Sequence, residues 1–521
     1  MSDLSALAED MAKRDVRHIF GIPGSGSSLT LLDELEKREV LFHLTHFEGT
    51  AALMAGAVGR LSGRAGVALS IKGPGLANMV PGLAACSLEA LPVVSISEAY
   101  LPGTPPSKAH KRINHEGLIS AVSKGRRFLA KKGPRFPDLA HWAESEVPGP
   151  VHLDISESGI EVEESIPVPR KDRAQEAFPK DKLSELISLA ERPVLIAGTL
   201  ALRKNLSMQL NQLAVPVFSV AAAKGVIDET LPQSAGVYTG VGMELTPEFS
   251  ILPEADLVIG IGLRHNEMLG VKPFPCRAIN LDPLGEELCS GFEFDHVFEG
   301  SQKEMEVVFA ALAGKEWGLG YLETCLVKMR ERLFSGQFMP AHAFQIMEQH
   351  FQHGARLVLD TGNFCTIGEH IWRVPEPRWY LSSGQGRYMG VGLPMALGAA
   401  VYDTSIPTVA CLGDGGIGMF IADIKLAVKY QLPLLIVLMS DSHLGSIRMR
   451  SIRDGLTEKP TLIHQPSWMK AVEGLGVYAA QATNETEIEK ILQSWNYSEG
   501  PLFMEIAFDP EGYQHMTRDI R

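Results

Sequence analysis

The stretch that decides the fold runs from Pro407 to Gly445 and reads PTVACLGDGGIGMFIADIKLAVKYQLPLLIVLMSDSHLG. It consists of a short apolar run, a glycine-rich turn, a helical pattern, a Leu-Pro break, a second apolar run and a polar turn. This order is typical of a strand-helix-strand unit with two parallel strands. Open parallel sheets bind ligands beyond the carboxyl ends of their strands. We therefore expect both turns to face one crevice.

Each of these two turns carries an aspartate. Asp414 lies in the first turn and Asp441 in the second. If the two strands are neighbours, both carboxylates point into the same crevice. Carboxylate oxygens beside a glycine-lined helix N-terminus suit Mg²⁺ or Ca²⁺ that carries a phosphate ester. The stretch therefore predicts a site for a metal ion and a diphosphate.

The first turn also fits two other interpretations. Gly413, Gly415 and Gly418 spell the G-x-G-x-x-G pattern of dinucleotide sites, between a strand and a helix. Asp414 would then face the pyrophosphate and repel it unless a cation lay between them. The third interpretation is a tight turn with a solvated aspartate. On this stretch alone, all three interpretations stay open.

The rest of the chain continues the alternation of short apolar strands with helices. This pattern predicts the α/β class, with three doubly wound parallel-sheet domains. The length of 521 residues agrees with about three domains. A polar stretch at Glu161–Lys180 and a second connection around Ser335–Pro340 separate them. We expect the domains at residues 1–162, 180–332 and 340–521.

The composition excludes several classes of protein. Hydrophobic residues make up 45 % and charged residues 21 %, as in globular proteins and not in disordered chains. The net charge of −14, without a long Lys/Arg run, disfavours nucleic acids and anionic membranes as partners. We expect no membrane span and no signal peptide. The six cysteines lack zinc-type or redox-type spacing, so we expect a cytoplasmic protein with reduced thiols.

Four blocks of sequence form a set with the same order as in a known family. They are VRHIFGIPGSGSSLTLLDEL (16–35), HFEGTAALMAGAVGRLSGRAGVALSIKGPGLANMVPGL (46–83), SSGQGRYMGVGLPMALGAA (382–400) and the GDG stretch, and FDPEGYQHM (508–516) adds a fifth. The set resembles the thiamine-diphosphate-dependent acetolactate synthase, pyruvate oxidase and benzoylformate decarboxylase superfamily. The resemblance implies a pyrimidine-binding domain, a central domain that holds FAD or ADP in some members, and a diphosphate-binding domain.

The resemblance implies a metal and diphosphate site in the C-terminal domain. The metal ligands would be the side chains of Asp414 and Asp441 and the main-chain oxygen of His443. Ser440 and Asp441 stand where the superfamily has paired asparagines, so an oxygen ligand is kept but a negative charge is added. The cofactor contacts implied here are Gly362, Asn363, Gly413, Gly415, Gly416, Leu444 and Gly445.

The resemblance also implies residues that act on the cofactor rings. Glu48 would hydrogen-bond the pyrimidine nitrogen, so that the exocyclic nitrogen can remove the thiazolium C2 proton. Met389 would wedge the cofactor into a bent shape. The alternatives are a Glu48 carboxylate that is stabilised by a helix N-terminus and a Met389 side chain that packs in the core. The other implied contacts on this side are Pro23, Gly75, Asn78 and Arg387.

Four residues are candidates for contact with the substrate. They are Ser25, Lys72, His110 and His115. The simpler alternatives are a serine that caps the following helix, a surface lysine and an exposed basic loop. Together with Arg448 and Arg450, Lys72 and the two histidines indicate a substrate that has a second negative group.

The implied activity is that of a lyase or transferase. We expect a thiamine-diphosphate-dependent decarboxylase and carboligase of a 2-oxo acid, similar to acetolactate synthase. The alternative is a decarboxylase of the benzoylformate or anionic 2-oxo acid type that does not ligate. An NAD-dependent dehydrogenase and a non-catalytic paralogue are further alternatives. Because superfamily sites combine two subunits, we expect a homodimer as the minimum and a homotetramer as the full assembly.

Overall fold

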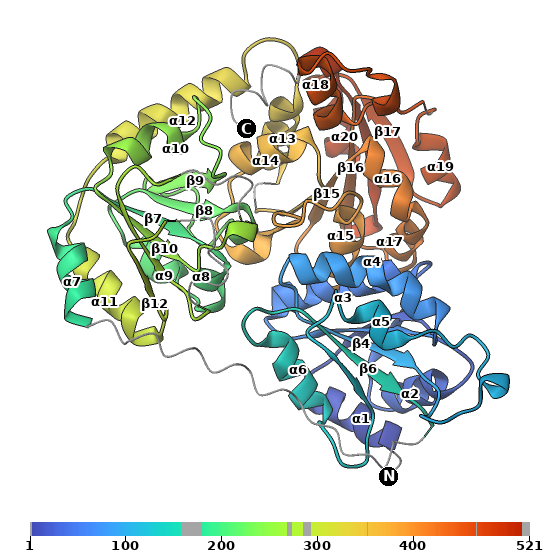
Figure 1. The fold of residues 1–521 in the computed structure, drawn as a ribbon. Helices are drawn as coiled ribbons and strands as arrows, with labels where there is room; N and C mark the ends of the chain where they lie inside the picture. The colour runs from blue at the N-terminus through green and yellow to red at the C-terminus, as the bar shows by residue number, and fades with distance from the viewer. Residues whose placement is uncertain are drawn as a thin grey trace.

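The structure is a computed structural model that describes residues 3–157, 180–267, 273–284, 293–351, 353–464 and 466–512. It contains three six-stranded sheets, one in each third of the chain, coloured blue, green and orange to red in Figure 1. All strand pairs are parallel, which confirms the predicted fold class. Residues 161–179 of the predicted linker and residues 513–516 of the C-terminal motif lie outside the described residues.

The N-terminal sheet has the strand order β2-β1-β3-β4-β6-β5. Its central strands are buried along their length, as expected where helices cover both faces. The strands are β1 (His18–Ile22), β2 (Leu41–Leu44), β3 (Gly66–Ser70), β4 (Val93–Glu98), β5 (Arg126–Phe128) and β6 (Pro150–Ile155). The helices are α1 (Asp3–Lys13), α2 (Ser27–Glu36), α3 (Glu48–Ser62), α4 (Pro74–Leu88), α5 (His115–Ile119) and α6 (Phe136–Glu144).

The central sheet has the order β12-β11-β10-β7-β8-β9. Counted within the domain, this is the 3-2-1-4-5-6 order of dinucleotide-binding folds. The strands are β7 (Pro193–Ala197), β8 (Val217–Val220), β9 (Ser234–Tyr238), β10 (Leu257–Ile261), β11 (Arg277–Leu281) and β12 (His296–Phe298). The helices are α7 (Lys180–Leu189), α8 (Thr199–Arg203), α9 (Ser207–Asn211), α10 (Pro247–Ile251), α11 (Gln302–Leu312) and α12 (Leu319–Leu333).

The C-terminal sheet, of order β14-β13-β15-β16-β18-β17, repeats the order of the N-terminal sheet. The G-x-G-x-x-G turn follows β15 and so does not belong to the sheet with dinucleotide-type order, which disfavours that interpretation. The strands are β13 (Arg356–Leu359), β14 (Tyr380–Ser382), β15 (Thr408–Gly413), β16 (Leu434–Ser440), β17 (Tyr478–Ala482) and β18 (Leu502–Ala507). The helices are α13 (Pro340–His350), α14 (Asn363–Ile371), α15 (Gly392–Tyr402), α16 (Asp414–Phe420), α17 (Ile424–Lys429), α18 (Gly445–Arg453), α19 (Met469–Gly474) and α20 (Glu485–Ser494).

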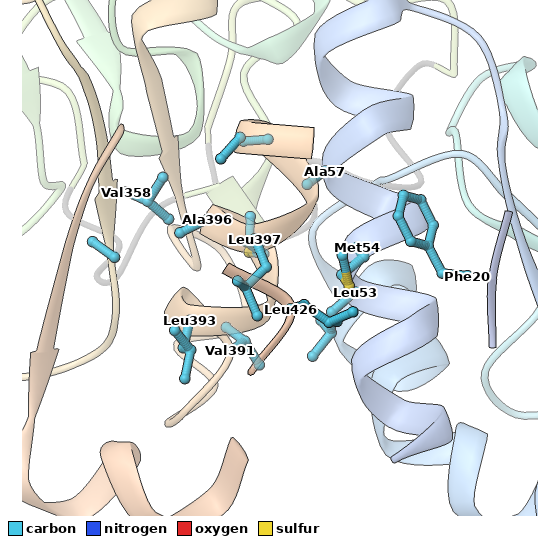
Figure 2. Close-up of a cluster of buried hydrophobic side chains, with 14 of the residues drawn as sticks. Phe20, Leu53, Met54, Ala57, Val358, Val391, Leu393, Ala396, Leu397 and Leu426 are labelled. Carbon is cyan, nitrogen blue, oxygen red and sulfur yellow. The ribbon is translucent and has the colours of Figure 1, made fainter. Parts of the chain in front are cut away.

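The N-terminal and C-terminal domains share one hydrophobic core. Helix α3 packs against α15, and Figure 2 shows Leu53 and Met54 of α3 facing Leu397 of α15 across this core. A Cβ at Gly398 would lie 2.5 Å from the main-chain oxygen of Met54. Glycine there is what allows the two helices to approach so closely. The packing fixes α3, and with it Glu48 at the first position of α3.

Buried carboxylates also join these two domains. Asp423 accepts a hydrogen bond from the main-chain N–H of His46 at 2.7 Å and another from the hydroxyl of Thr50. Glu89 accepts from the Ser383 hydroxyl at 3.0 Å and from the N–H of Gly386 at 2.6 Å. Such buried charge-assisted bonds hold the two domains in one relative position.

Among the described helices, none combines the length and the apolar character that crossing a membrane requires.

Candidate active site

Asp414 and the residues after β16 form one compact turn. Strands β15 and β16 are neighbours, with Gly413 beside Met439, so both strand ends meet at one edge of the sheet. The Ser440 hydroxyl donates to Oδ1 of Asp414 at 2.9 Å, and the N–H groups of Asp441 and Ser442 donate to its Oδ2 at 2.8 and 2.9 Å. The structure thus brings Asp414 and Asp441 together in one turn at this edge of the sheet.

Asp441 lies within this turn close to a second negative charge. Burial, together with the nearby Asp414 carboxylate, raises the pKa of Asp441 to about 6. Its Oδ1 accepts from the N–H of His443 at 3.0 Å, and Nδ1 of His443 lies 2.6 Å from the main-chain oxygen of Asp441. A buried and a partly buried carboxylate in one turn form a site at which a divalent cation would be stabilising.

Three helices begin around this turn. Asn363 opens α14, Asp414 opens α16 and Gly445 opens α18. A Cβ at Gly445 would lie 2.8 Å from Nδ2 of Asn363 and 3.1 Å from Oδ2 of Asp441, so the α14 and α18 starts are in contact. Gly362 is the N-cap of α14. Converging helix N-termini offer N–H groups and positive dipole ends, which suit a diphosphate.

Met389, one of the residues predicted to contact the cofactor rings, lies against the same turn. A Cβ at Gly415 would lie 2.7 Å from Sδ of Met389 and 2.8 Å from Cδ2 of Leu444. The glycine therefore leaves a cradle between these two side chains. Arg387, with a φ of +48°, is held by Glu369 at 3.0 Å, which anchors the segment that leads into Met389.

Asp360, which the sequence reasoning missed, fixes the other side of that segment. It follows β13 directly, is 1 % exposed, and both of its oxygens accept from the N–H of Gly390 at 2.9 Å. A Cβ at Gly416 would lie 2.3 Å from Oδ2 of Asp360, so the carboxyl also underlies α16. Burial raises the pKa of Asp360 to about 7. The only signal in the sequence was an aspartate at the end of an apolar strand.

Glu48 forms a second group of predicted residues, in the N-terminal domain. Its side chain is buried (6 % exposed), and its Oε2 accepts from Nδ2 of Asn78 at 3.1 Å. A Cβ at Gly75 would lie 3.2 Å from its Oε1. Glu48, Gly75 and Asn78, which the sequence places in one motif, are therefore in contact. Pro23 follows the end of β1, on the same sheet.

Within one chain, Glu48 and Asp414 lie toward opposite ends of α16. The Phe47 ring is 6.0 Å from that of Phe420, the last residue of α16, whereas Asp414 is the first. A helix of this length spans roughly 10 Å. In the described residues, Asn78 is the hydrogen-bond partner of the Glu48 carboxyl. Glu48 and Asp414 thus belong to two groups of site residues that lie toward opposite ends of α16.

The candidate substrate residues lie near the carboxyl ends of the N-terminal strands. Lys72 follows β3, and its Nζ is 2.6 Å from Oε2 of Glu98. His115 is buried rather than exposed: its Nε2 accepts from the N–H of Gly73 at 3.0 Å, and its Nδ1 lies 2.6 Å from Oδ1 of Asp154. His110 is exposed.

Ser25 is exposed and does not cap α2. The N-cap position is Gly26, and the start of the helix is held by Glu98 from β4. Oε1 of Glu98 accepts from the N–H groups of Gly26 and Ser28, both at 3.1 Å, and from the Ser28 hydroxyl at 2.6 Å. The cap is therefore supplied by a side chain far away in the sequence, and the simpler interpretation of Ser25 is wrong.

In the central domain the equivalent turn is filled by the chain itself. Thr199, the first residue of α8, directs its N–H to Oε2 of Glu267 at 3.2 Å. A Cβ at Gly198 would lie 2.5 Å from the same oxygen. A carboxylate of this chain thus occupies the position that a dinucleotide phosphate would take in such a sheet.

Comparison with known proteins agrees with this division into three parts. Residues 3–101 match the model of the N-terminal TPP binding domain of thiamine pyrophosphate enzymes, residues 181–297 the central domain, and residues 360–506 the C-terminal TPP binding domain. The chain is 28 % identical to the "Probable acetolactate synthase large subunit" of Methanocaldococcus jannaschii, covering 98 % of this chain and 92 % of that protein.

Two further relatives carry related names. The chain is 25 % identical to "Acetolactate synthase isozyme 1 large subunit" of Escherichia coli, over 96 % of this chain and 93 % of the relative. It is 24 % identical to "Acetolactate synthase large subunit" of Haemophilus influenzae, over 98 % of this chain and 95 % of the relative. The family matches follow the order of the motifs that carry the resemblance. The chain therefore belongs to the thiamine pyrophosphate enzyme family.

Proposed function

We propose that this protein decarboxylates a 2-oxo acid and joins the remaining fragment to a second carbonyl compound, with thiamine diphosphate and a divalent metal ion. The observation that carries the proposal is the meeting of three helix N-termini and two carboxylates beside Met389. The names of the relatives support the acetolactate synthase type of reaction.

The donor set fits a hard divalent cation. Asp414 and Asp441 offer carboxylate oxygens, which Mg²⁺ and Ca²⁺ prefer, and His443 lies in the same turn. The Ser440 hydroxyl and two backbone N–H groups hold the Asp414 carboxylate in one orientation within the turn. The metal would offset the repulsion between the two carboxylates.

The glycine cradles fit the cofactor. Side chains at Gly75 or Gly415 would fill space next to Glu48 and Met389 respectively. Thiamine diphosphate, when bound, supplies a carbon nucleophile and an electron sink for the loss of CO₂. Glu48 would hold a proton toward a ring nitrogen, and Asn78 keeps its carboxyl in position. Met389 would limit the conformations of the bound molecule.

A complete site on this proposal needs two chains. The resemblance to superfamily sites that combine two subunits supports a Glu48 from a second copy at each metal turn, and within one chain Glu48 and Asp414 lie toward opposite ends of α16. Around the turn, Met389, Met419 and Ile447 expose apolar surface in the single chain, as surfaces that meet a partner do. We propose a homodimer as the minimal active unit, which can pair into a tetramer.

The test is reconstitution with thiamine diphosphate, Mg²⁺ and a panel of 2-oxo acids. CO₂ release would be followed, and the products would be identified by mass spectrometry. We expect release to require both additions, and a 2-hydroxy-3-oxo acid to form from pyruvate. An aldehyde as the sole product would replace ligation with simple decarboxylation. Turnover with NAD in the absence of metal, or failure to bind thiamine diphosphate, would contradict the proposal.

A further inference from the structure

A cavity of about 420 Å³ lies beyond the carboxyl ends of β4 and β5 in the N-terminal domain. Small-molecule sites typically have volumes of about 300–1,000 Å³. Its lining includes four cationic side chains and one carboxylate, that of Glu116. The cations are Lys72, Lys111, Arg112 and Arg126. No role in the proposed cofactor site uses Lys111, Arg112 or Arg126.

Two of these cations already have carboxylate partners. Lys72 is paired with Glu98 at 2.6 Å. Arg126 is paired with the buried Asp154, and its Nη1 lies 3.8 Å from Glu116. These pairs contribute little net positive charge, so the charge that the cavity offers to a ligand comes from the other two side chains.

Arg112 is held in place without losing its charge. Its Cζ lies 5.5 Å from the centroid of the Tyr100 ring, and its Nη1 donates to the main-chain oxygen of Thr104 at 2.8 Å. Nζ of Lys72 is 5.4 Å from the same ring centroid. The Tyr100 hydroxyl donates to the main-chain oxygen of His110, which fixes the ring. Within the part of the chain that the structure describes, neither Lys111 nor Arg112 forms an ion pair.

The cavity and Glu48 are connected through one short turn. A Cβ at Gly73 would lie 1.9 Å from the main-chain oxygen of Lys111, and the Gly73 N–H donates to buried His115. The loop that carries Lys111 is therefore seated on this turn, and Lys111 itself has a φ of +65°, which non-glycine residues seldom adopt. Two residues after Gly73, Gly75 contacts Glu48.

We propose that this cavity binds the second anionic group of a 2-oxo acid that carries two, such as a terminal carboxylate or phosphonate. The inference rests on the proposed function, since it assumes that a 2-oxo acid reacts beside Glu48. Lys111 and Arg112 supply the attraction, and Tyr100 holds Arg112 ready, so that little side-chain ordering is needed on binding.

The experiment compares the holoenzyme, loaded with thiamine diphosphate and Mg²⁺, with the variant K111Q/R112Q. One arm measures kcat/KM for pyruvate, 2-oxoglutarate and phosphonopyruvate. A second arm measures binding of glutarate, which lacks the reacting oxo group, and of inorganic phosphate by calorimetry. R17Q is the control, because Arg17 is an exposed cation of the same domain outside the cavity.

We expect one of the doubly anionic acids to be favoured over pyruvate, and that ratio of kcat/KM to fall about 10-fold in K111Q/R112Q. Glutarate binding should weaken similarly, and R17Q should behave as the wild type. Preference for the terminal carboxylate or for the phosphonate distinguishes the two anions.

An unchanged ratio together with unchanged glutarate binding would overturn the inference while leaving the proposed function intact. Phosphate binding as tight as glutarate binding, and equally lost in the variant, would replace the inference with a site for free phosphate. If no acid releases CO₂, the proposed function fails, and the glutarate arm still decides whether the cavity binds anions.

Discussion

The first and last sheets of the molecule have the same strand order but carry opposite charges after their third strands. In both, the third strand of the domain ends in a glycine-containing turn that leads into a helix. The turn after β3 carries Lys72, whereas Asp414 follows β15 directly as the first residue of α16. The topology thus determines where a crevice forms, and the side chains determine which charge it accepts.

The two crevices also hold their charged groups by different means. Lys72 lies between Glu98 and the face of Tyr100, whereas Asp414 is held by main-chain N–H groups and a hydroxyl. Backbone donors stabilise a carboxylate without adding a full positive charge beside it. The acidic crevice is therefore left able to take a cation, and the basic crevice an anion.

The largest expected effect comes from the Glu48 carboxyl group. Glu48→Gln should lower kcat by about 10²–10⁴-fold, because an acid-base group is removed while its bond to Asn78 can be kept. Steady-state CO₂ release measures this. The matched control is Asp138→Asn, which changes a carboxylate in the first turn of another helix of that domain and should keep wild-type turnover. Near-wild-type turnover of the Glu48 variant would contradict a role of Glu48 as an acid-base group.

The acidic crevice should respond unequally to its two carboxylates. Asp414→Asn should weaken Mn²⁺ binding by at least about 10-fold. The amide has only one oxygen, so its N–H₂ group must replace either the oxygen that faces the Ser440 hydroxyl or the oxygen that faces two backbone N–H donors, and the turn loses its orientation. Asp441→Asn keeps an oxygen ligand and removes a like charge, so we expect a much smaller loss. Calorimetric titration with Mn²⁺ in the presence of thiamine diphosphate compares the variants. Equal losses would show that the turn does not hold the metal as described.

The smallest expected effect is a pH dependence of stability from Asp360. Its pKa in the folded protein, about 7, is raised above the ordinary value of 3.8, so between these values the folded state binds the extra proton. The stabilisation is therefore greatest in acid and falls as the pH rises toward 7. The melting temperature of the wild type minus that of Asp360→Asn should drop by several degrees from pH 4.5 to pH 7.5. A difference that rises with pH would contradict the buried, proton-retaining carboxyl.

The sequence predicts the parts of the site that neighbouring segments build. Asp414 and Asp441 end adjacent strands of one unit, and Glu48, Gly75 and Asn78 share one motif, so their meeting follows from local order. The alternation of apolar strands with helices along the whole chain also predicts the three-sheet fold.

Partners that meet only after folding left no such signal. The contacts of His115 with Asp154, of Glu98 with Ser28 and of Asp360 with Gly390 join residues far apart in the sequence. As a result, His115 is buried, although its place in a basic loop suggests an exposed side chain. The N-terminus of α2 is likewise capped by Glu98 from β4. Which charged side chains stay unpaired depends on such contacts, and composition does not reveal it.

The most direct test of the central claim mixes two inactive chains. Glu48→Gln and Asp414→Asn subunits are purified separately, then dissociated and reassociated in equal amounts. If each site takes Glu48 from one chain and Asp414 from its partner, every mixed dimer regains one intact site, and random pairing returns about a quarter of wild-type CO₂ release. If both groups serve the same site within one chain, every site keeps a defect. The mixture would then stay as inactive as its components, which would contradict the account.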